Sequence, residues 1–510
     1  MGVRALVAAG VLVAGALTGT LTAPGAAGAD SCDSAAATDF NGDGHNDVAV
    51  GDYRANVADM VAAGAVAVLY GDDEIDDGDW TTLTEDTPGV TSGPSPNTGA
   101  ASGDGFGWSI TTAHVDADRC LDLVVGAPWR DDGGRVDAGA VYVVFGSPDG
   151  LGKGRPGLLL RPGDWGPAQT GQLFGWSLGG ADASGTDGSA VAIGAPYEDR
   201  PPKSGDGSGS IRDAGAVHVA WFGSDGAPAT RKSFGQDFKS FPGIPEEGDL
   251  FGWAVLLGST GGNAGQRDLI TSEPFEDVNG EGTNAGSVSV LNDISGPADK
   301  VTLEHWHYGN IDVPPVSNGE IGYSLAYVED GNTRYVAAGI PGQTVNGHQG
   351  AGAVKMFTST GSGLKPAELL SKTDGAAGDR FGLSVALAGS AVTGAGTQLA
   401  VGAPNANGQR GFAQLVPLAN PDQSVRLEAG SAGVPGSAAA GAHFGQSVAF
   451  AGDRSAGGAL LVGVPDDRQK VTGSIVVRPF DGKPSRFVPD DIGIPPADLT
   501  DFGGSFSGTR

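Results

Sequence analysis

The sequence predicts an all-β fold, namely a seven-bladed β-propeller built from four-stranded antiparallel blades. Glycine accounts for 89 of the 510 residues, yet 39% of the chain is hydrophobic, which indicates many turns around a sizeable core. A short phrase that begins with Phe-Gly returns along the chain at spacings of 58 to 77 residues. No stretch shows helical periodicity of useful length.

Each repeated unit contains the same series of short apolar runs. The first run carries the Phe-Gly phrase, in the forms FGWSI, FGWSL, FGWAV, IGYSL, FGLSV and FGQSV at Phe106, Phe174, Phe251, Ile321, Phe381 and Phe444. The second run ends in GAP or a variant, as in LDLVVGAP at 121–128, and the third begins with glycine, as in GAVYVVF at 139–145. A weaker fourth run follows, as in WTTLT from Trp80. Four short strands separated by turns fit a propeller blade, which needs neighbouring blades to bury both of its faces.

The two ends of the chain are predicted to complete one blade. The first unit, with DVAVGD at 47–52, lacks a Phe-Gly phrase, whereas FGGSF at 502–506 has no unit of its own. We therefore expect the C-terminal strand to join the first blade, which closes the ring and removes exposed sheet edges.

These phrases resemble the FG-GAP repeat family, which includes the N-terminal propeller of integrin α chains and occurs in bacterial exported proteins. The resemblance covers essentially the whole chain after residue 29. It implies a seven-bladed propeller that mainly binds partners, with Ca²⁺ in the hairpins that join the first two strands of some blades. Unit four has SEP at 272–274 in place of GAP, and unit five begins with Ile321-Gly322, so we expect these two blades to be less regular.

The N-terminal segment predicts export. Arg4 precedes a short apolar run from Ala5 to Leu17, and Ala27-Gly28-Ala29 offers small residues for cleavage after Ala29. We interpret residues 1–29 as a signal peptide and residues 30–510 as one FG-GAP propeller, secreted to the extracellular space. The apolar run is short for a membrane span, and no later stretch is apolar for long enough.

The charge of the chain indicates which partners it can bind, and its cysteine content indicates whether it forms a disulfide. The chain has 60 acidic and 30 basic residues, so it repels nucleic acid and anionic membranes. The acidity either holds bound cations or simply keeps an exported protein soluble. Two cysteines, Cys32 and Cys120, predict one disulfide in an exported chain, with two free buried thiols as the alternative. We expect a monomer.

The stretch DFNGDGHND at 39–47 predicts a Ca²⁺ site. The ligands would be side-chain oxygens and one backbone carbonyl, from Asp39, Asn41, Asp43, Asp47 and, through its carbonyl, His45. It is not an EF-hand, because the twelfth position is Val50 and a strand follows, which is the form that the FG-GAP family uses. The alternative is an acidic turn without metal.

A second loop, from Ala113 to Asp122, aligns with the first. Three acids fit ligand positions, namely Asp116, Asp118 and Asp122. His114 replaces the first acid and Arg119 replaces the glycine, so the arginine charge is one candidate to stand in for a cation, and metal binding here stays open. Because adjacent blades bring the two loops to one rim, we expect a bridge between Cys32 and Cys120.

The loops after GAP are predicted to share the face opposite the calcium hairpins. Four of them begin with an aromatic residue beside a charge: Tyr53 and Arg54, Trp129 and Arg130, Tyr197 and Glu198, Phe275 and Glu276. Such a surface suits a carbohydrate or a protein hot spot. The alternative is that each aromatic residue packs on its own blade. The aromatic residues of the Phe-Gly phrases are expected to pack between blades, namely Trp108, Trp176, Trp253 and Tyr323.

No catalytic residue is assigned. Residues 175–179 match the GxSxG pattern of hydrolases, but Ser177 belongs to the repeated Phe-Gly phrase, so the match is accidental. The sequence therefore favours an exported, non-catalytic binding or adhesion protein that presents loops to an extracellular protein or glycan and is stabilised by Ca²⁺. The alternative is an exported polysaccharide-acting lyase or hydrolase on a propeller scaffold.

Overall fold

The computed structural model describes the chain after its N-terminal segment, with short gaps. The residues described are Cys32 and 38–72, 79–91, 99–183, 188–202, 209–238, 241–261, 266–372, 374–431, 433–453, 458–466, 473–492 and 501–506. The predicted signal peptide at 1–29 lies outside these residues.

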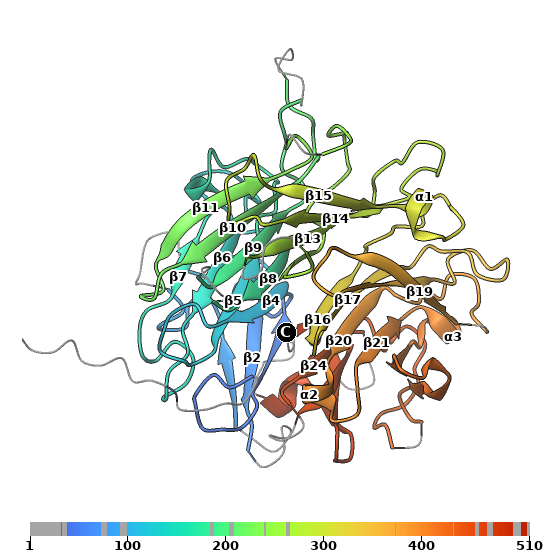
Figure 1. Cartoon of the computed structure of the whole chain (residues 1–510). Helices are drawn as coiled ribbons and strands as arrows, with labels where there is room; N and C mark the ends of the chain where they lie inside the picture. The colour runs from blue at the N-terminus through green and yellow to red at the C-terminus, as the bar shows by residue number, and fades with distance from the viewer. Residues whose placement is uncertain are drawn as a thin grey trace, which may run out of the picture.

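The described residues form seven four-stranded antiparallel sheets arranged as the blades of a propeller (Figure 1). Blade 1 contains β28 (Ser505–Phe506), β1 (Val48–Asp52), β2 (Ala65–Tyr70) and β3 (Asp79–Leu83). Blade 2 contains β4 (Ser109–Ala113), β5 (Asp122–Ala127), β6 (Ala140–Val144) and β7 (Leu158–Leu160). Blade 3 contains β8 (Ser177–Ala181), β9 (Ala190–Ala195), β10 (Ala216–Phe222) and β11 (Pro228–Phe234).

The remaining four blades repeat this order from the inner to the outer strand. Blade 4 contains β12 (Val255–Gly258), β13 (Asp268–Glu273), β14 (Ser287–Asn292) and β15 (Thr302–Trp306). Blade 5 contains β16 (Leu325–Asp330), β17 (Thr333–Ile340), β18 (Ala353–Ser359) and β19 (Lys365–Ser371). Blade 6 contains β20 (Ser384–Ala388), β21 (Gln398–Ala403), β22 (Phe412–Pro417) and β23 (Val425–Leu427). Blade 7 contains β24 (Val448–Ala451), β25 (Ala459–Val464), β26 (Ser474–Pro479) and β27 (Ser485–Phe487).

Helices are short connectors. They are α1 (Tyr308–Ile311), α2 (Ser390–Thr393) and α3 (Ala406–Gln409), with 3-10 turns at Pro162–Asp164, Pro421–Gln423 and Pro489–Ile492. None of the helices in the described part of the chain has the length and apolar character needed to cross a membrane.

The C-terminal strand closes the ring, as the sequence predicted. β28 pairs antiparallel with β1, with Val50 opposite Phe506 and Gly51 opposite Ser505. Phe502 and Phe506 are buried in the same apolar cluster as Val50. In Figure 1 the colour runs around the ring, so the red end of the chain returns beside the blue beginning.

The repeated phrases build the contacts between neighbouring blades. Gly126 of one GAP phrase lies so close to the next blade that a Cβ there would be 2.3 Å from the carbonyl oxygen of Gly175. Ser109 of the Phe-Gly phrase donates its hydroxyl to that same oxygen over 2.7 Å. Ser177 makes the corresponding bond to Gly252 O over 2.8 Å, so this serine has a structural role. The Phe of each such phrase is fully or almost fully buried: Phe106, Phe174, Phe251, Phe381, Phe444 and Phe502.

Blade 4 keeps four strands in unbroken register, and only its contacts with the neighbouring blade depart from this pattern. Ala254 replaces the serine of the Phe-Gly phrase and therefore lacks the hydroxyl. Ser272 of SEP replaces the glycine, and its Cβ would lie 2.6 Å from a Cβ at Gly322 of blade 5. The side chain of Ser272 instead accepts a hydrogen bond from the backbone N–H of Ala254 over 3.3 Å. In blade 5 the Ile321-Gly322 phrase makes the usual contact through Ser324, and the irregularity is a register shift between β18 and β19.

The inner strands of all seven blades surround a central cavity of about 230 Å³. Each inner strand begins at the fourth or fifth residue of a Phe-Gly phrase, and those of blades 2 to 7 end at the hairpin that leads to the second strand. The third residues of the phrases therefore lie at one mouth of the cavity, and the hairpins lie at the other.

Candidate functional site

The first acidic loop, at residues 39–47, is tightly wound by hydrogen bonds from its own backbone. Asp39 accepts bonds from the N–H groups of Gly42 and Gly44, over 2.5 and 2.9 Å. Asp43 accepts from His45 N over 2.8 Å, and Asn41 Nδ2 donates to Asp43 over 2.8 Å. The loop thus forms a glycine-rich turn in which its acidic side chains accept hydrogen bonds from its own backbone.

Asp47 anchors the end of this loop inside the protein. Its side chain is fully buried and accepts hydrogen bonds from Phe40 N and Gly71 N, over 2.7 and 3.0 Å. Burial raises the pKa of Asp47 to about 8, because desolvation outweighs the two N–H donors. A cation beside the carboxylate would lower that pKa and compensate for the burial.

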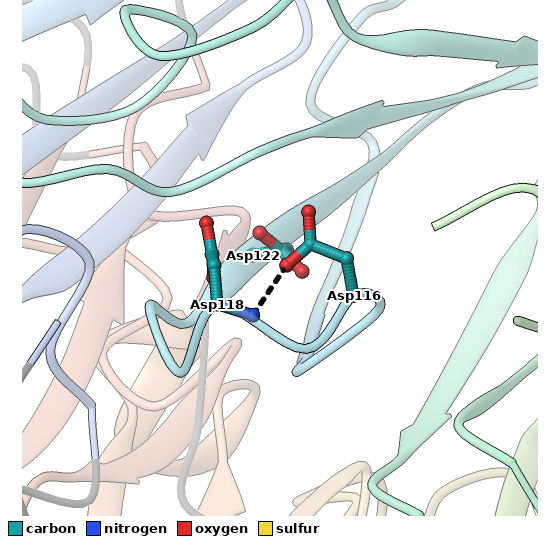
Figure 2. Close-up of side chains that lie close together, drawn as sticks. All are labelled: Asp116, Asp118 and Asp122. Atoms are coloured by element: carbon teal, nitrogen blue, oxygen red, sulfur yellow. Dashed lines mark hydrogen bonds between the residues drawn. The ribbon is translucent and has the colours of Figure 1, made fainter. Parts of the chain in front are cut away.

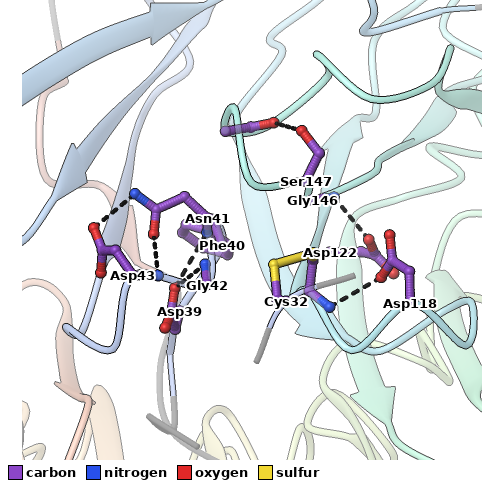
Figure 3. The surroundings of a disulfide bond; sticks show 12 residues. Cys32, Asp39, Phe40, Asn41, Gly42, Asp43, Asp118, Asp122, Gly146 and Ser147 are labelled. Atoms are coloured by element: carbon purple, nitrogen blue, oxygen red, sulfur yellow. Dashed lines mark hydrogen bonds between the residues drawn. A yellow bond between two sulfur atoms is a disulfide. The ribbon is translucent and has the colours of Figure 1, made fainter. Parts of the chain in front are cut away.

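A disulfide joins the segment that precedes the first acidic loop to the second acidic loop. Cys32 and Cys120 are bonded, with a Cα–Cα distance of 4.9 Å, and Figure 3 shows this bridge between the first loop and the second. Backbone bonds support it: Cys32 N donates to Asp118 O over 3.0 Å, and Leu121 N donates to Asp39 O over 3.1 Å. The sequence-based prediction of this disulfide is confirmed.

The second loop brings three carboxylates together, as Figure 2 shows. One oxygen from each of Asp116, Asp118 and Asp122 lies within 4.8 Å of the others. Burial, and then the hydrogen bond with Asp116, raises the pKa of Asp118 to about 7, and burial raises the pKa of Asp122 well above its usual value. The cation that contacts this group is Arg155, whose Nη1 lies 3.0 Å from Asp116 Oδ2, rather than Arg119.

The two loops therefore differ in how they fit a metal. Both have the carboxylate and carbonyl oxygens that hard cations prefer. Within the described residues, Asp39, Asp43 and Asp47 do not form a set with oxygens all within 4.8 Å, whereas the three acids of the second loop do. The first loop has the types of oxygen ligand that Ca²⁺ prefers, whereas the second loop has carboxylate oxygens close enough together to share one ion.

On the opposite face, eight aromatic rings form a continuous series around one side of the cavity mouth. We call this series the aromatic arc. It consists of Tyr53, Trp108, Trp129, Trp176, Tyr197, Trp253, Phe275 and Tyr323. All eight residues are half-buried, so each keeps part of its surface exposed.

The inner row of the arc comes from the Phe-Gly phrases of blades 2 to 5. The ring centroids of Trp108 and Trp176 are 4.7 Å apart, those of Trp176 and Trp253 are 4.9 Å apart, and those of Trp253 and Tyr323 are 5.4 Å apart. Trp108 Nε1 also donates to Trp176 O over 2.9 Å. These residues pack between neighbouring blades, as predicted, but sequence reasoning did not include them in the ligand face.

The outer row comes from the loops after GAP. Tyr53 packs edge-on against Trp108 of the next blade, with centroids 4.8 Å apart, and Trp129 lies 4.9 Å from the same ring. Tyr197 and Phe275 contact the tryptophan of their own blades, at 5.8 and 5.2 Å. The predicted aromatic residues of four separate loops are thus brought together by the inner row.

The charged residues predicted beside these rings occupy different depths. Arg54 is exposed and lies over the Tyr53 ring, 5.1 Å from its centroid. Arg130 is buried and contacts Glu85, with Nε and Oε2 3.4 Å apart. Burial favours a raised pKa for Glu198, but His218 and Arg200 outweigh it, so the pKa of this buried carboxyl is lowered. Glu276 is half-buried next to Phe275.

A serine–histidine–glutamate series lies beneath the arc in blade 3. His218 Nε2 lies 2.7 Å from Glu198 Oε2, and His218 Nδ1 lies 2.8 Å from Ser233 Oγ. His218 is 4% exposed, and its ring packs against Trp165 and Phe174. This burial is typical of a structural polar network, although the same order of groups occurs in hydrolases.

Comparisons with known proteins agree with the repeat pattern. A family model described as "FG-GAP repeat" matches residues 106–144. Curated relatives include phosphatidylinositol-glycan-specific phospholipase D of Rattus norvegicus, 30% identical over 168 residues, which are 32% of this chain and 18% of the relative. The Homo sapiens protein of the same name is 29% identical over 202 residues, which are 38% of this chain and 21% of the relative. The match thus spans about a fifth of the length of these relatives.

Solved structures of similar shape are more distant. One described as "Structure of Dos1 propeller" has a TM-score of 0.40 and 9% identity, and the match covers 91% of this chain and 87% of that one. One described as "Crystal structure of the eukaryotic initiation factor" has a TM-score of 0.32 and 13% identity, and covers 83% and 75%.

Proposed function

Because this chain is an FG-GAP repeat protein folded as a seven-bladed propeller, we propose that it is an exported, non-catalytic binding protein. The aromatic arc is the proposed contact surface for an extracellular protein or glycan. The first acidic loop, on the opposite face, is proposed to hold Ca²⁺ and to stabilise the fold.

The arc is the observation that carries this proposal. Eight half-buried rings from five blades present apolar surface around one mouth of the cavity, with Arg54 beside Tyr53 and Arg380 over Tyr323. Stacked aromatic faces bind the apolar faces of sugar rings and also form protein hot spots, because they bury a large area at little entropic cost.

Binding is tested with a glycan array and with a pull-down from cell-surface material. Trp129→Ala and Tyr197→Ala should each weaken binding at least about tenfold, as expected for central aromatic contacts. Trp80→Ala is the matched control, since this tryptophan lies in outer strand β3 and packs against Phe487. Equal loss in the control, or no loss in the arc variants, contradicts the proposal.

Catalysis is the second candidate, in the form of an exported polysaccharide-acting lyase or hydrolase, or of a phosphodiester hydrolase. Two observations favour it: the curated relatives are named as a phospholipase D, and Ser233, His218 and Glu198 are joined in series. Turnover of polysaccharide or of phosphatidylinositol-glycan that Ser233→Ala abolishes in folded protein would establish this alternative. We expect no such turnover.

For the metal, the first loop is our proposed Ca²⁺ site, with Asp39, Asn41, Asp43 and Asp47 as side-chain ligands and the carbonyl of His45. Its support is the donor set and the buried Asp47 carboxylate. The second loop is the competing site, supported by the close spacing of its three acids.

A further inference from the structure

A second group of carboxylates lies on the arc face, far in sequence from the hairpin loops. One oxygen from each of Glu246, Asp249 and Glu276 lies within 4.8 Å of the others. Glu246 and Asp249 precede inner strand β12 of blade 4, and Glu276 follows β13 directly after Phe275 of the arc. Glu246 is exposed, Glu276 is half-buried and Asp249 is 2% exposed, so the group runs from the surface into the protein.

A buried amide is directed at this group from blade 3. Gln236, which is 2% exposed, donates from Nε2 to Glu276 Oε2 over 2.6 Å. Its Oε1 is buried and has no hydrogen-bond partner among the described residues. An unpaired buried amide oxygen costs stability, and a half-turn of the carboxamide would direct it toward the carboxylates. The amide nitrogen thus contacts the group already, and after that half-turn the amide would present to it a neutral oxygen that is suited to a cation.

A further buried carboxyl group, that of Glu273, lies behind the group, and its Oε1 lies 3.6 Å from His305 Nδ1. Glu273 is the middle residue of SEP, it is fully buried, and its Oε2 has no hydrogen-bond partner among the residues described. Burial raises its pKa well above the usual value, and the charges of Glu276 and Asp249 raise it further.

Blade 2 shows how the fold balances charge at the equivalent place. Glu85 follows β3 by two residues, Asp104 precedes Phe106 by two, and Arg130 follows β5 by three. Arg130 Nε lies 3.4 Å from Glu85, and the charges of both Glu85 and Asp104 act on its guanidinium. A built-in cation thus neutralises the acids between blades 1 and 2.

Blade 4 has the same three positions with different residues. Gln236 follows β11 by two residues, Asp249 precedes Phe251 by two, and Glu276 follows β13 by three. The glutamate is therefore replaced by a glutamine and the arginine by a glutamate, so two of the three positions carry a carboxylate and none carries a cation. In the described part of the chain, no lysine, arginine or histidine forms an ion pair with any member of this group.

We propose that Glu246, Asp249 and Glu276, with the carboxamide of Gln236, form a binding site for a hard divalent cation at the rim of the arc. Carboxylate and amide oxygens are the ligands such cations prefer. The cation takes the place that Arg130 fills in blade 2. The proposal rests on residues where blades 3 and 4 meet and does not depend on the ligand of the arc.

The test uses Ca²⁺ as the probe. Equilibrium dialysis of the full chain with ⁴⁵Ca²⁺ measures the number of ions bound per chain. Glu276→Gln keeps the shape of the side chain and should remove one bound ion, or weaken its binding at least about tenfold. Asp277→Asn is the matched control, because it removes the same charge from the adjacent exposed residue and should retain the ion. The hairpin loops are unchanged in both variants.

A third variant distinguishes a cation site from a group that merely holds protons. Glu276→Arg recreates the arrangement of blade 2, so it should remove the same bound ion and raise the melting temperature in chelator. The proposal is overturned if Glu276→Gln, shown to be folded by circular dichroism, binds as many ions as the unaltered chain. It is also overturned if Asp277→Asn loses the ion equally, since a general charge effect would then explain the loss.

Discussion

The backbone N–H of Asp501 donates a hydrogen bond to Oδ1 of Asp52 over 2.8 Å, although 449 residues separate the two. Asp52 ends β1 and Asp501 directly precedes the last Phe-Gly phrase. The bond therefore lies at the junction where the first and last segments of the chain close the propeller, and this junction determines how the ring responds to truncation and to pH.

Deletion of residues 501–510 should strongly destabilise the protein. The deletion removes β28 and two buried rings, Phe502 and Phe506, and leaves the edge of β1 unpaired. Loss of a buried phenylalanine costs about 3–5 kcal/mol, so we expect the melting temperature to fall by several degrees or more. Deletion of 507–510 alone, which leaves β28 intact, is the control. A shift within a degree or two for the longer deletion contradicts closure by this strand.

Stability should fall as the pH rises from about 4 to 7, in part because of Asp52. Burial raises its pKa to about 7, so between its unfolded and folded pKa values the native state holds a proton that the unfolded chain releases. Asp52→Asn keeps an acceptor for Asp501 N–H and should remove up to about 3 kcal/mol of the stability lost between pH 5 and pH 8, since only the interval up to about pH 7 contributes. Urea unfolding at pH 5 and pH 8 measures it. Asp59→Asn, at an exposed position of the same blade, should leave the slope unchanged.

Much of this architecture could be predicted because the same phrases occur in every repeat and mark the same strands each time. The order of these phrases along the chain determines which segments are neighbours in the ring. The strands, the closing strand and the disulfide could therefore be predicted from it. The group around Glu276 could not be predicted in the same way, since Gln236 comes from the preceding blade and only the packing of two blades brings it close. The contact between Arg155 and Asp116 likewise joins two loops that no repeated phrase links.

The bond between Cys32 and Cys120 should protect the protein against unfolding. It spans 88 residues, and closing a loop of that length in the unfolded chain is worth roughly 4.6 kcal/mol in the chain-entropy model. Thiol titration of denatured, unreduced protein should find no free thiol, and reduction should lower the urea midpoint. Two titratable thiols would reject the bridge. Cys120→Ser should match the reduced protein, since both lack only the cross-link.

Gly194 and Ser177 should differ sharply in their tolerance of alanine. A Cβ at Gly194 would lie 2.2 Å from Gly252 O of the next blade, so Gly194→Ala must separate two blades and should prevent stable folding. Ser177→Ala loses one hydrogen bond to the same oxygen and should cost about 1 kcal/mol. Thermal unfolding compares them. Comparable losses in the two variants would show that the close approach of the blades is not required.

Calcium binding should raise the melting temperature, and mutation can distinguish the contribution of the first acidic loop from that of the second. Three acids of the first loop, Asp39, Asp43 and Asp47, repel one another without a cation, and Ca²⁺ at about 100 times its dissociation constant would add roughly 2.7 kcal/mol. In a Glu276→Gln background, which removes the site proposed in blade 4, chelator should lower the melting temperature, and Asp43→Ala should abolish most of that shift. Asp116→Ala should do little, because Arg155 already contacts this carboxylate over 3.0 Å.

If Asp116→Ala abolishes the shift and Asp43→Ala does not, the metal belongs to the second loop. A melting curve that chelator leaves unchanged, in protein shown to be loaded with Ca²⁺, removes the stabilising role from both loops. The disulfide links the segments that carry the two acidic loops. The comparison is therefore made with Cys32 and Cys120 oxidised, so that loss of metal is not confused with loss of the cross-link.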